Sequence, residues 1–178
     1  VETTLSLSFR CSQAIVEAAR WRAPEFSWLK PGGHYETLHL LHSKDIPDGA
    51  AIICRNNAPL FAVAFRLLAN QRSVQVAGSE IGPKLVRLLQ KIGQDWDDSD
   101  TLVAKIDAWY NEKLEKTNSP KALKDQADCL KIFASFGKTL AQAVAYAEHL
   151  FKQQGPIKLS TGHKAKGLEY ETVYFLDP

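Results

Sequence analysis

Segments with the pattern of β-strands stop near residue 78 and return only at residue 157 of this 178-residue chain. Between residues 82 and 154 the apolar residues recur at helical spacing, and Gly155-Pro156 ends this helical stretch. Strands on both sides of a helical segment favour one sheet that contains all of them. We therefore predict an α/β domain that an all-helical segment interrupts.

The expected elements follow from local patterns. Strands are predicted over 5–9, 36–41, 50–54 and 73–77, then from Ile157, and again after Glu169. The stretch 50–54 is continuously apolar, which is typical of a central parallel strand. We expect a helix over 12–21, capped by Ser12, and a helix over 58–70, capped by Asn56 or Asn57. Four further helices are expected in the interrupting segment, with Trp109 in their core.

Bulk composition excludes several classes of protein. The net charge is only +2, so any contact with nucleic acid must come from local clusters of cations. No apolar run approaches the ~20 residues that a membrane span needs, so we expect no membrane partner. Cys11, Cys54 and Cys129 fit no metal or redox spacing, and we expect free thiols in a cytoplasmic protein. The first residue is Val, and we expect the chain to be a segment of a larger protein.

The most distinctive motif joins the last two predicted strands. The strand from Ile157 runs into Thr-Gly-His-Lys-Ala-Lys-Gly-Leu-Glu over 161–169, and another strand follows. We expect this turn to place backbone N–H groups, lysines, a hydroxyl and a carboxylate on a single sheet edge. Such groups suit a phosphate backbone on one side and a sugar hydroxyl on the other. The segment resembles motif V of the UvrD/Rep-type superfamily 1 DNA helicases.

A second resemblance lies near the start of the chain. In Leu-Ser-Leu-Ser-Phe-Arg-Cys-Ser over 5–12, Arg10 is expected at the turn from a strand to a helix. The segment resembles motif IV of the same helicases, with Ser8 in place of the usual Asn and Cys11 in place of the usual Ser. A third stretch, 51–58, resembles the V-L-x-R-x-N element of that fold and contains Arg55.

The resemblance implies roles for individual residues. Arg10 would contact the γ-phosphate of ATP as the catalytic arginine, and Glu169 would accept hydrogen bonds from the ribose, with Gly167 permitting close backbone approach. Single-stranded DNA would contact Thr161, His163, Lys166 and Arg55. Alternatives from the residues themselves are a purely structural role for Arg55, a loop-shaping hydrogen bond for His163, and solvated side chains for Lys164 and Lys166.

The implied fold is a RecA-like (P-loop NTPase-like) α/β domain with a mostly parallel sheet and flanking helices. Residues 1–81 and 156–178 would form the second RecA-like domain, called 2A. The segment 82–155 occupies the place of the family's 2B insertion but is much shorter. The cofactor would be ATP with Mg²⁺, whose ligands would lie in an upstream RecA-like domain of the same protein. We expect no metal site in this chain.

The sequence also lacks key parts of a motor. No Walker A motif is present, because 78–84 has the wrong glycine spacing and no hydroxyl after Lys84. We therefore expect the chain to form part of an ATP-dependent DNA helicase while being inactive alone. Two alternatives stay open: a degenerate helicase-like module that binds DNA or protein without ATPase activity, and the motor arm of a helicase–nuclease.

Overall fold

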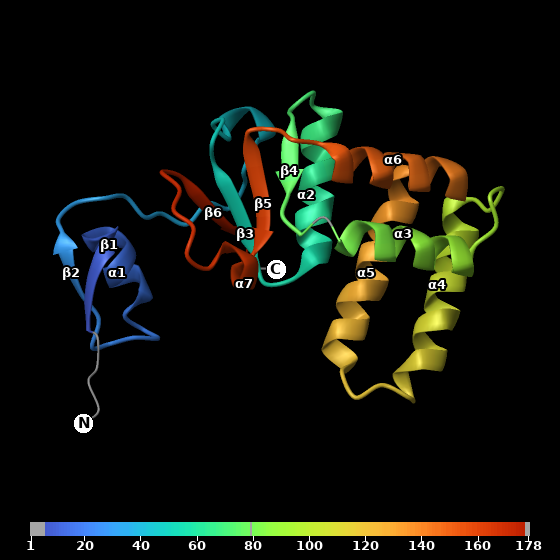
Figure 1. Ribbon diagram of the computed structural model, residues 1–178, viewed down its shortest axis with the longest axis horizontal. Helices are drawn as coiled ribbons and strands as arrows, with labels where there is room; N and C mark the ends of the chain where they lie inside the picture. Colours follow the sequence, from blue (N-terminus) through green and yellow to red (C-terminus); the bar gives the residue numbers. More distant parts are fainter. Residues whose placement is uncertain (1–5, 79, 177–178) are drawn as a thin grey trace. The chain divides into compact units, whose positions relative to one another are not determined.

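The computed structural model describes residues 6–78 and 80–176 (Figure 1). Contacts within the chain divide it into two compact units, Val1–Leu41 and His42–Pro178.

The first unit is a small β-α-β arrangement. Strand β1 (Leu7–Ser12) leads through helix α1 (Gln13–Ala19) to strand β2 (Ser27–Lys30), and the two strands are parallel. The prediction that the first strand joins the main sheet is wrong, because β1 pairs with β2 in a sheet of two strands. The strand predicted over 36–41 is also wrong. Residues 31–40 are exposed and irregular, so no neighbouring backbone completes a ladder there.

The second unit contains a parallel sheet of four strands in the order β4-β5-β3-β6. These strands are β3 (Ala51–Cys54), β4 (Val74–Val76), β5 (Ile157–Thr161) and β6 (Val173–Leu176). All four residues of β3 are buried, which confirms the prediction of a central strand from a continuous apolar run. The prediction that strands before and after the helical segment share one sheet is confirmed for these four.

Helices occupy the rest of the second unit. Helix α2 (Asn57–Ala69) follows β3 and contacts both the sheet and helices α5 and α6 (Figure 1). The helical block consists of α3 (Ile81–Ile92), α4 (Ser99–Leu114), α5 (Pro120–Phe136) and α6 (Leu140–Lys152), as predicted. Two short helices complete the unit, a 3₁₀ helix at Ser43–Asp45 and α7 (Gly162–Ala165). The α/β class is therefore established, while the division into a 2A domain and an insertion stays a prediction.

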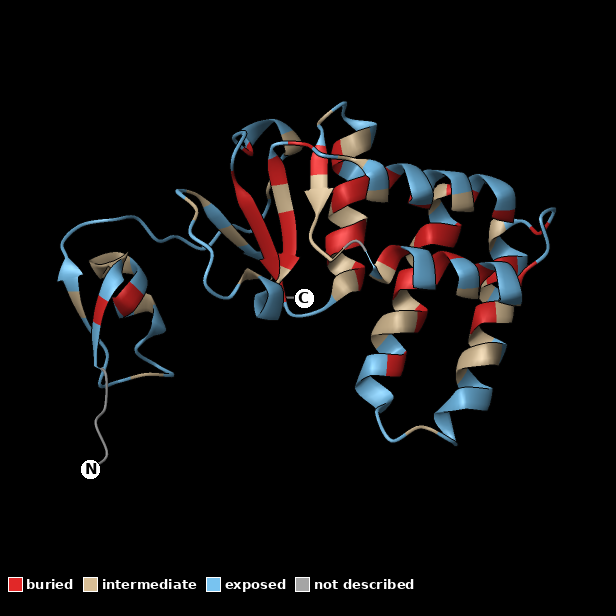
Figure 2. Cartoon of the chain, in the orientation of Figure 1, coloured by how far each residue is buried: buried red, intermediate tan, exposed pale blue. Residues whose placement is uncertain are grey.

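Five phenylalanines join the helical block to the helix that covers the sheet. Phe61 and Phe65 of α2 face Phe133 and Phe136 of α5 and Phe151 of α6. The Phe65 and Phe136 rings stack with centroids 4.6 Å apart, and Phe61 lies 5.3 Å from Phe133 and 5.4 Å edge-on from Phe151. Buried residues run without interruption from the sheet through α2 into the block (Figure 2). The block and the sheet thus share one core.

A buried aspartate, Asp97, connects the α3–α4 segment to α4 and to the start of α6. The Asp97 carboxylate, in the α3–α4 connection, accepts hydrogen bonds from the Gln94 amide at 2.7 Å and from Lys105 Nζ at 2.5 Å. The Lys105 ammonium holds the pKa of Asp97 below its ordinary value. The Asp97 carbonyl accepts from the Leu140 amide at the start of α6. Trp109, predicted in the core, is only half-buried, because the buried residues of α4 are Leu102 and Ile106.

The three cysteines are free thiols, as predicted from their spacing. Cys11 is half-buried, whereas Cys54 and Cys129 are buried. Burial among apolar side chains raises the pKa of Cys129 far above that of an exposed thiol, because the thiolate would be poorly solvated there.

We predict that Phe133→Ala destabilises the whole second unit rather than the block alone. Phe133 is fully buried and contacts rings from α2 and α6, so its removal leaves a cavity in the shared core. The expected loss in the free energy of unfolding is about 3–5 kcal/mol, measured by urea denaturation with circular dichroism. Tyr146→Ala removes an aromatic ring that is 51% exposed and serves as the control. A loss below about 1 kcal/mol for Phe133→Ala would contradict a shared core.

Candidate nucleic-acid interface

Two turns meet at the edge of the sheet where its strands end. Strands β3 and β5 are parallel neighbours, and Cys54 lies opposite Thr161 in the register. The segments that follow these residues therefore leave the sheet side by side. One begins with Arg55 and enters α2, and the other enters α7. The structure thus places the four predicted DNA contacts, Arg55, Thr161, His163 and Lys166, in or beside these two turns.

The turn after β5 is held by backbone geometry. Thr161 is the N-cap residue of α7, but its side chain makes no capping hydrogen bond. The Leu168 amide donates to the Ala165 carbonyl and closes the turn. Gly167 has φ = +88°, a conformation that favours glycine. A Cβ at Gly167 would meet no atom within 4 Å, so the expected reason for this glycine, close backbone approach, is not seen among the described residues.

Lys164 turns away from the strand ends and toward the connection between β4 and α3. Its Nζ lies 3.1 Å from Glu80 Oε1, and this hydrogen bond lowers the pKa of Glu80. The ammonium also lies over Gly78, where φ is +92° and a Cβ would come within 2.0 Å of Nζ. Lys164 is therefore engaged in an ion pair rather than simply solvated, and it fixes the turn against the neighbouring connection.

The remaining cationic and polar groups of these turns point into solvent. Arg55, His163 and Lys166 are exposed, and Thr161 is half-buried. Within residues 6–78 and 80–176, no hydrogen bond or ion pair is found for the side chains of Arg55, His163 or Lys166. The loop-shaping hydrogen bond that was an alternative for His163 is therefore not seen in this part of the chain. These donors are available to an external acceptor such as a phosphate oxygen.

Glu169 lies elsewhere, which corrects the expectation of a single sheet edge. It lines a separate pocket of roughly 340 Å³ with residues 47–50 and 170–172, which immediately precede β3 and β6. The chain crosses the length of the sheet between α7 and β6, so Glu169 reaches the edge where the strands begin (Figure 1). Asp48 and Glu171 line the same pocket. Asp48 pairs with Arg72 Nη2 at 3.0 Å, and carboxylate oxygens of this kind accept hydrogen bonds from hydroxyl donors.

Arg10 is not at the end of its strand as predicted, because β1 continues to Ser12. It lies between Ser8 and Ser12, where the register with β2 shifts. The Cys11 amide donates to Ser8 Oγ at 3.0 Å, and Lys30 Nζ donates to the Arg10 carbonyl at 3.4 Å. The Arg10 residue is exposed. Ser8 and Cys11 are the two residues that differ from the motif IV pattern. The hydrogen bond between them thus spans Arg10.

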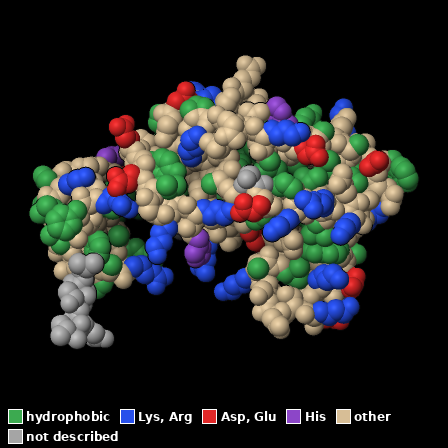
Figure 3. All heavy atoms as spheres, in the orientation of Figure 1, with side chains coloured by type: hydrophobic (Ala, Val, Ile, Leu, Met, Phe, Trp, Pro, Cys, Tyr) green, Lys and Arg blue, Asp and Glu red, His purple; other side chains and the backbone are tan. Residues whose placement is uncertain are grey.

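A larger pocket opens beside Arg55, between the start of α2 and helix α5. Its volume is roughly 920 Å³. The lining residues are Arg55, Asn56, Ala58, Pro59, Ala62, Lys121, Ala122, Lys124, Asp125, Asp128, Lys131 and Ile132. On the face shown in Figure 3, Lys and Arg side chains spread over the helical block, with Asp and Glu between them. This site was not predicted from the sequence, although the charged residues between 121 and 131 recur at helical spacing on one side of α5.

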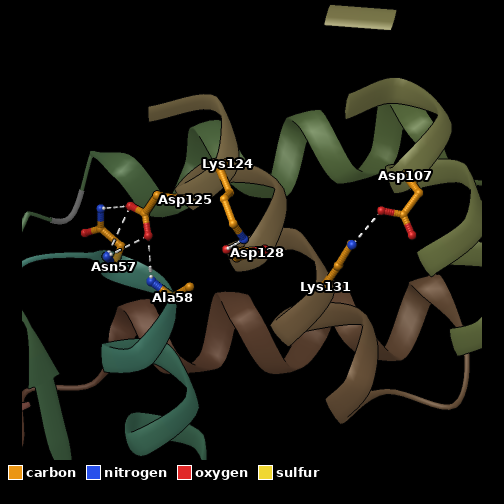
Figure 4. A network of polar contacts seen from close by, with 7 residues as sticks. All are labelled: Asn57, Ala58, Asp107, Lys124, Asp125, Asp128 and Lys131. Carbon is orange, nitrogen blue, oxygen red and sulfur yellow. Dashed lines mark hydrogen bonds and ion pairs between the residues drawn. The ribbon is translucent and has the colours of Figure 1, made fainter. Parts of the chain in front are cut away.

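Asp125 of α5 caps helix α2 from across this pocket (Figure 4). Its carboxylate accepts from the Asn57 amide at 3.0 Å, the Ala58 amide at 3.1 Å and Asn57 Nδ2 at 2.9 Å. The predicted side-chain cap from Asn56 or Asn57 is wrong, since Asn56 makes no capping bond and Asn57 donates to Asp125. A carboxylate satisfies free amides and complements the positive end of the helix dipole.

Comparisons with protein-family models, with curated proteins and with solved structures gave no match to this chain. No helix in the described part of the chain has the length and apolar character that crossing a membrane requires. Among residues 6–78 and 80–176, no three His, Cys, Asp or Glu side chains gather as metal ligands. The site is therefore characterised by its own geometry and by the residues that the sequence supplies.

We predict that Asp125→Ala weakens the second unit more than removal of a neighbouring carboxylate does. Asp125→Ala leaves two amides of α2 without their acceptor and is expected to cost about 1–3 kcal/mol in the free energy of unfolding. Asp128→Ala removes only an exposed pair with Lys124 one turn along the same helix, at about 0.5 kcal/mol or less. Urea denaturation of both variants decides the matter. Equal losses would show that the Asp125 cap contributes nothing.

Proposed function

We propose that this chain is part of an ATP-dependent DNA helicase or translocase of the UvrD/Rep type. It contributes part of the track for single-stranded DNA and one wall of an ATP site that is completed by an upstream RecA-like domain. The cytoplasmic setting and the 2A assignment belong to the same proposal. The chain alone does not hydrolyse ATP, because it carries no Walker A motif.

One observation carries the proposal. The pairing of β3 with β5 brings Arg55 beside the turn that contains Thr161, His163 and Lys166, although about a hundred residues separate them in sequence. Exposed donors that lack partners among the described residues, gathered where parallel strands end, suit the phosphates of a single strand. The resemblance of residues 161–169 to a helicase motif supports the same ligand.

The nucleotide side of the proposal rests on two residues. Arg10 is exposed, and a guanidinium is suited to binding phosphate. Glu169 shares its pocket with Asp48 and Glu171, and carboxylate oxygens accept hydrogen bonds from ribose hydroxyls. ATP with Mg²⁺ would supply the phosphoryl group and its charge neutralisation, with the Mg²⁺ ligands on the upstream domain.

A second candidate function is a helicase-like module that binds DNA without ATPase activity. The position of Glu169 favours it, because this residue lies at the opposite edge of the sheet from the DNA-facing turns. In that case the site at the ends of β3 and β5 keeps its ligand, whereas Arg10 and Glu169 have no nucleotide to bind.

We predict that Arg10→Ala in the full-length protein abolishes DNA-stimulated ATP hydrolysis. A catalytic arginine contributes about 10³-fold or more to such a rate, so turnover should fall at least that far. Steady-state ATPase assays with and without single-stranded DNA measure it. Arg22→Ala is the matched control, because Arg22 lies in the same unit and packs over the exposed Trp21 ring.

Near-normal turnover in a folded Arg10→Ala protein would contradict the motor assignment. A full-length protein that hydrolyses no ATP before any substitution would favour the second candidate. Circular dichroism of each variant confirms that it has kept its fold.

A further inference from the structure

One side of helix α5 presents charged residues to the pocket beside Arg55. Lys121, Lys124 and Lys131 line it together with Asp125 and Asp128. The buried residues of the same helix are Leu123, Ala127, Cys129, Leu130, Phe133 and Ala134. The charged side is a surface next to the sheet edge, on which Asp125 contacts the start of α2 and Lys131 pairs with Asp107 of α4.

The carboxylates in this pocket are already occupied. Asp125 accepts from the start of α2, and Asp128 lies 2.8 Å from Lys124 Nζ. Lys131 pairs with Asp107 of α4, which is not part of the lining (Figure 4). Across the described residues, the side chains of Lys121 and Arg55 make no hydrogen bond or ion pair. The lining holds four cations and two carboxylates, and with Asp107, the partner of Lys131, the group keeps an excess of one positive charge.

We propose that this pocket binds the phosphate backbone of single-stranded DNA and carries the strand from the sheet edge onto the helical block. Lys121 and Lys124 would contact phosphates next to the one bound by Arg55. The inference rests on the proposed function, because Arg55 belongs to both surfaces. The inference assigns to the helical block a role in holding the DNA strand.

Two features favour a nucleic-acid strand over an acidic protein. The pocket continues from the turns where phosphate donors gather, since Arg55 stands in both. Its cations stand beside an apolar lining of Ala58, Pro59, Ala62, Ala122 and Ile132. Such a mixture accommodates phosphates together with sugar and base surfaces, whereas an acidic peptide needs only the charges.

The test is fluorescence anisotropy of a labelled oligothymidylate with the whole chain over a series of salt concentrations. In Lys121→Gln/Lys124→Gln, affinity at the lowest salt should fall about three- to tenfold. The slope of log affinity against log salt should fall by about 1.4, which corresponds to two phosphate contacts on a single strand. Lys113→Gln/Lys116→Gln is the matched control, since it removes two lysines of the same block that lie outside the pocket.

A parallel variant, His163→Ala/Lys166→Ala, separates this inference from the proposed function. If the turn variant weakens binding while the α5 variant behaves as its control, the inference is wrong and the proposed site stands. If only the α5 variant weakens binding, the inference stands and the turn has lost its proposed role. Binding that neither variant weakens, or no binding by the unsubstituted chain, overturns both. Competition by polyglutamate as effective as by unlabelled oligothymidylate would also overturn the strand assignment.

Discussion

The parallel pairing of β3 with β5 is the contact on which the rest of the second unit depends. These strands are remote in sequence, yet their register aligns Cys54 with Thr161 and so brings two turns to one sheet edge. After β3 the chain passes through α2 and β4, and the block of four helices then occupies the connection from β4 to β5. Loss of this pairing would separate Arg55 from His163 and Lys166. The candidate interface therefore exists because two strands that are remote in sequence pair in one sheet.

The helical block is joined to the sheet by two kinds of contact. Aromatic rings of α5 and α6 pack against α2 in a shared core, and Asp125 of α5 satisfies the first amides of the same helix. Helix α2 begins two residues after Arg55, so the block that caps it also supports the turn that presents this arginine. Such packing suits a block that moves with the sheet. A block of this kind would hold a DNA strand in place beside the sheet and would not move relative to the sheet.

The fold could be predicted from the sequence where one local pattern determined the outcome. The apolar run at 50–54 predicted a central strand, which the structure has at 51–54, and the helical periodicity after residue 82 predicted four helices. Prediction failed where a residue distant in sequence determined the local structure. Asp125 is 68 residues from Asn57, so its cap on α2 left no local trace. Glu169 adjoins the motif turn in sequence, but the path from α7 to the start of β6 takes it to the opposite edge. No motif in the sequence distinguishes Lys121 and Lys124, and only the fold places Arg55 beside them.

Hydrogen exchange of the chain, with and without an oligothymidylate, shows whether both turns bind one DNA strand. We expect slower amide exchange at residues 55–57 and 162–166 when the oligonucleotide is bound, because both turns contact the same DNA strand. Protection at only one of the two turns would mean that the β3–β5 pairing does not create a joint surface. Protection at neither turn, in a complex that forms, would contradict the claim that this sheet edge binds single-stranded DNA.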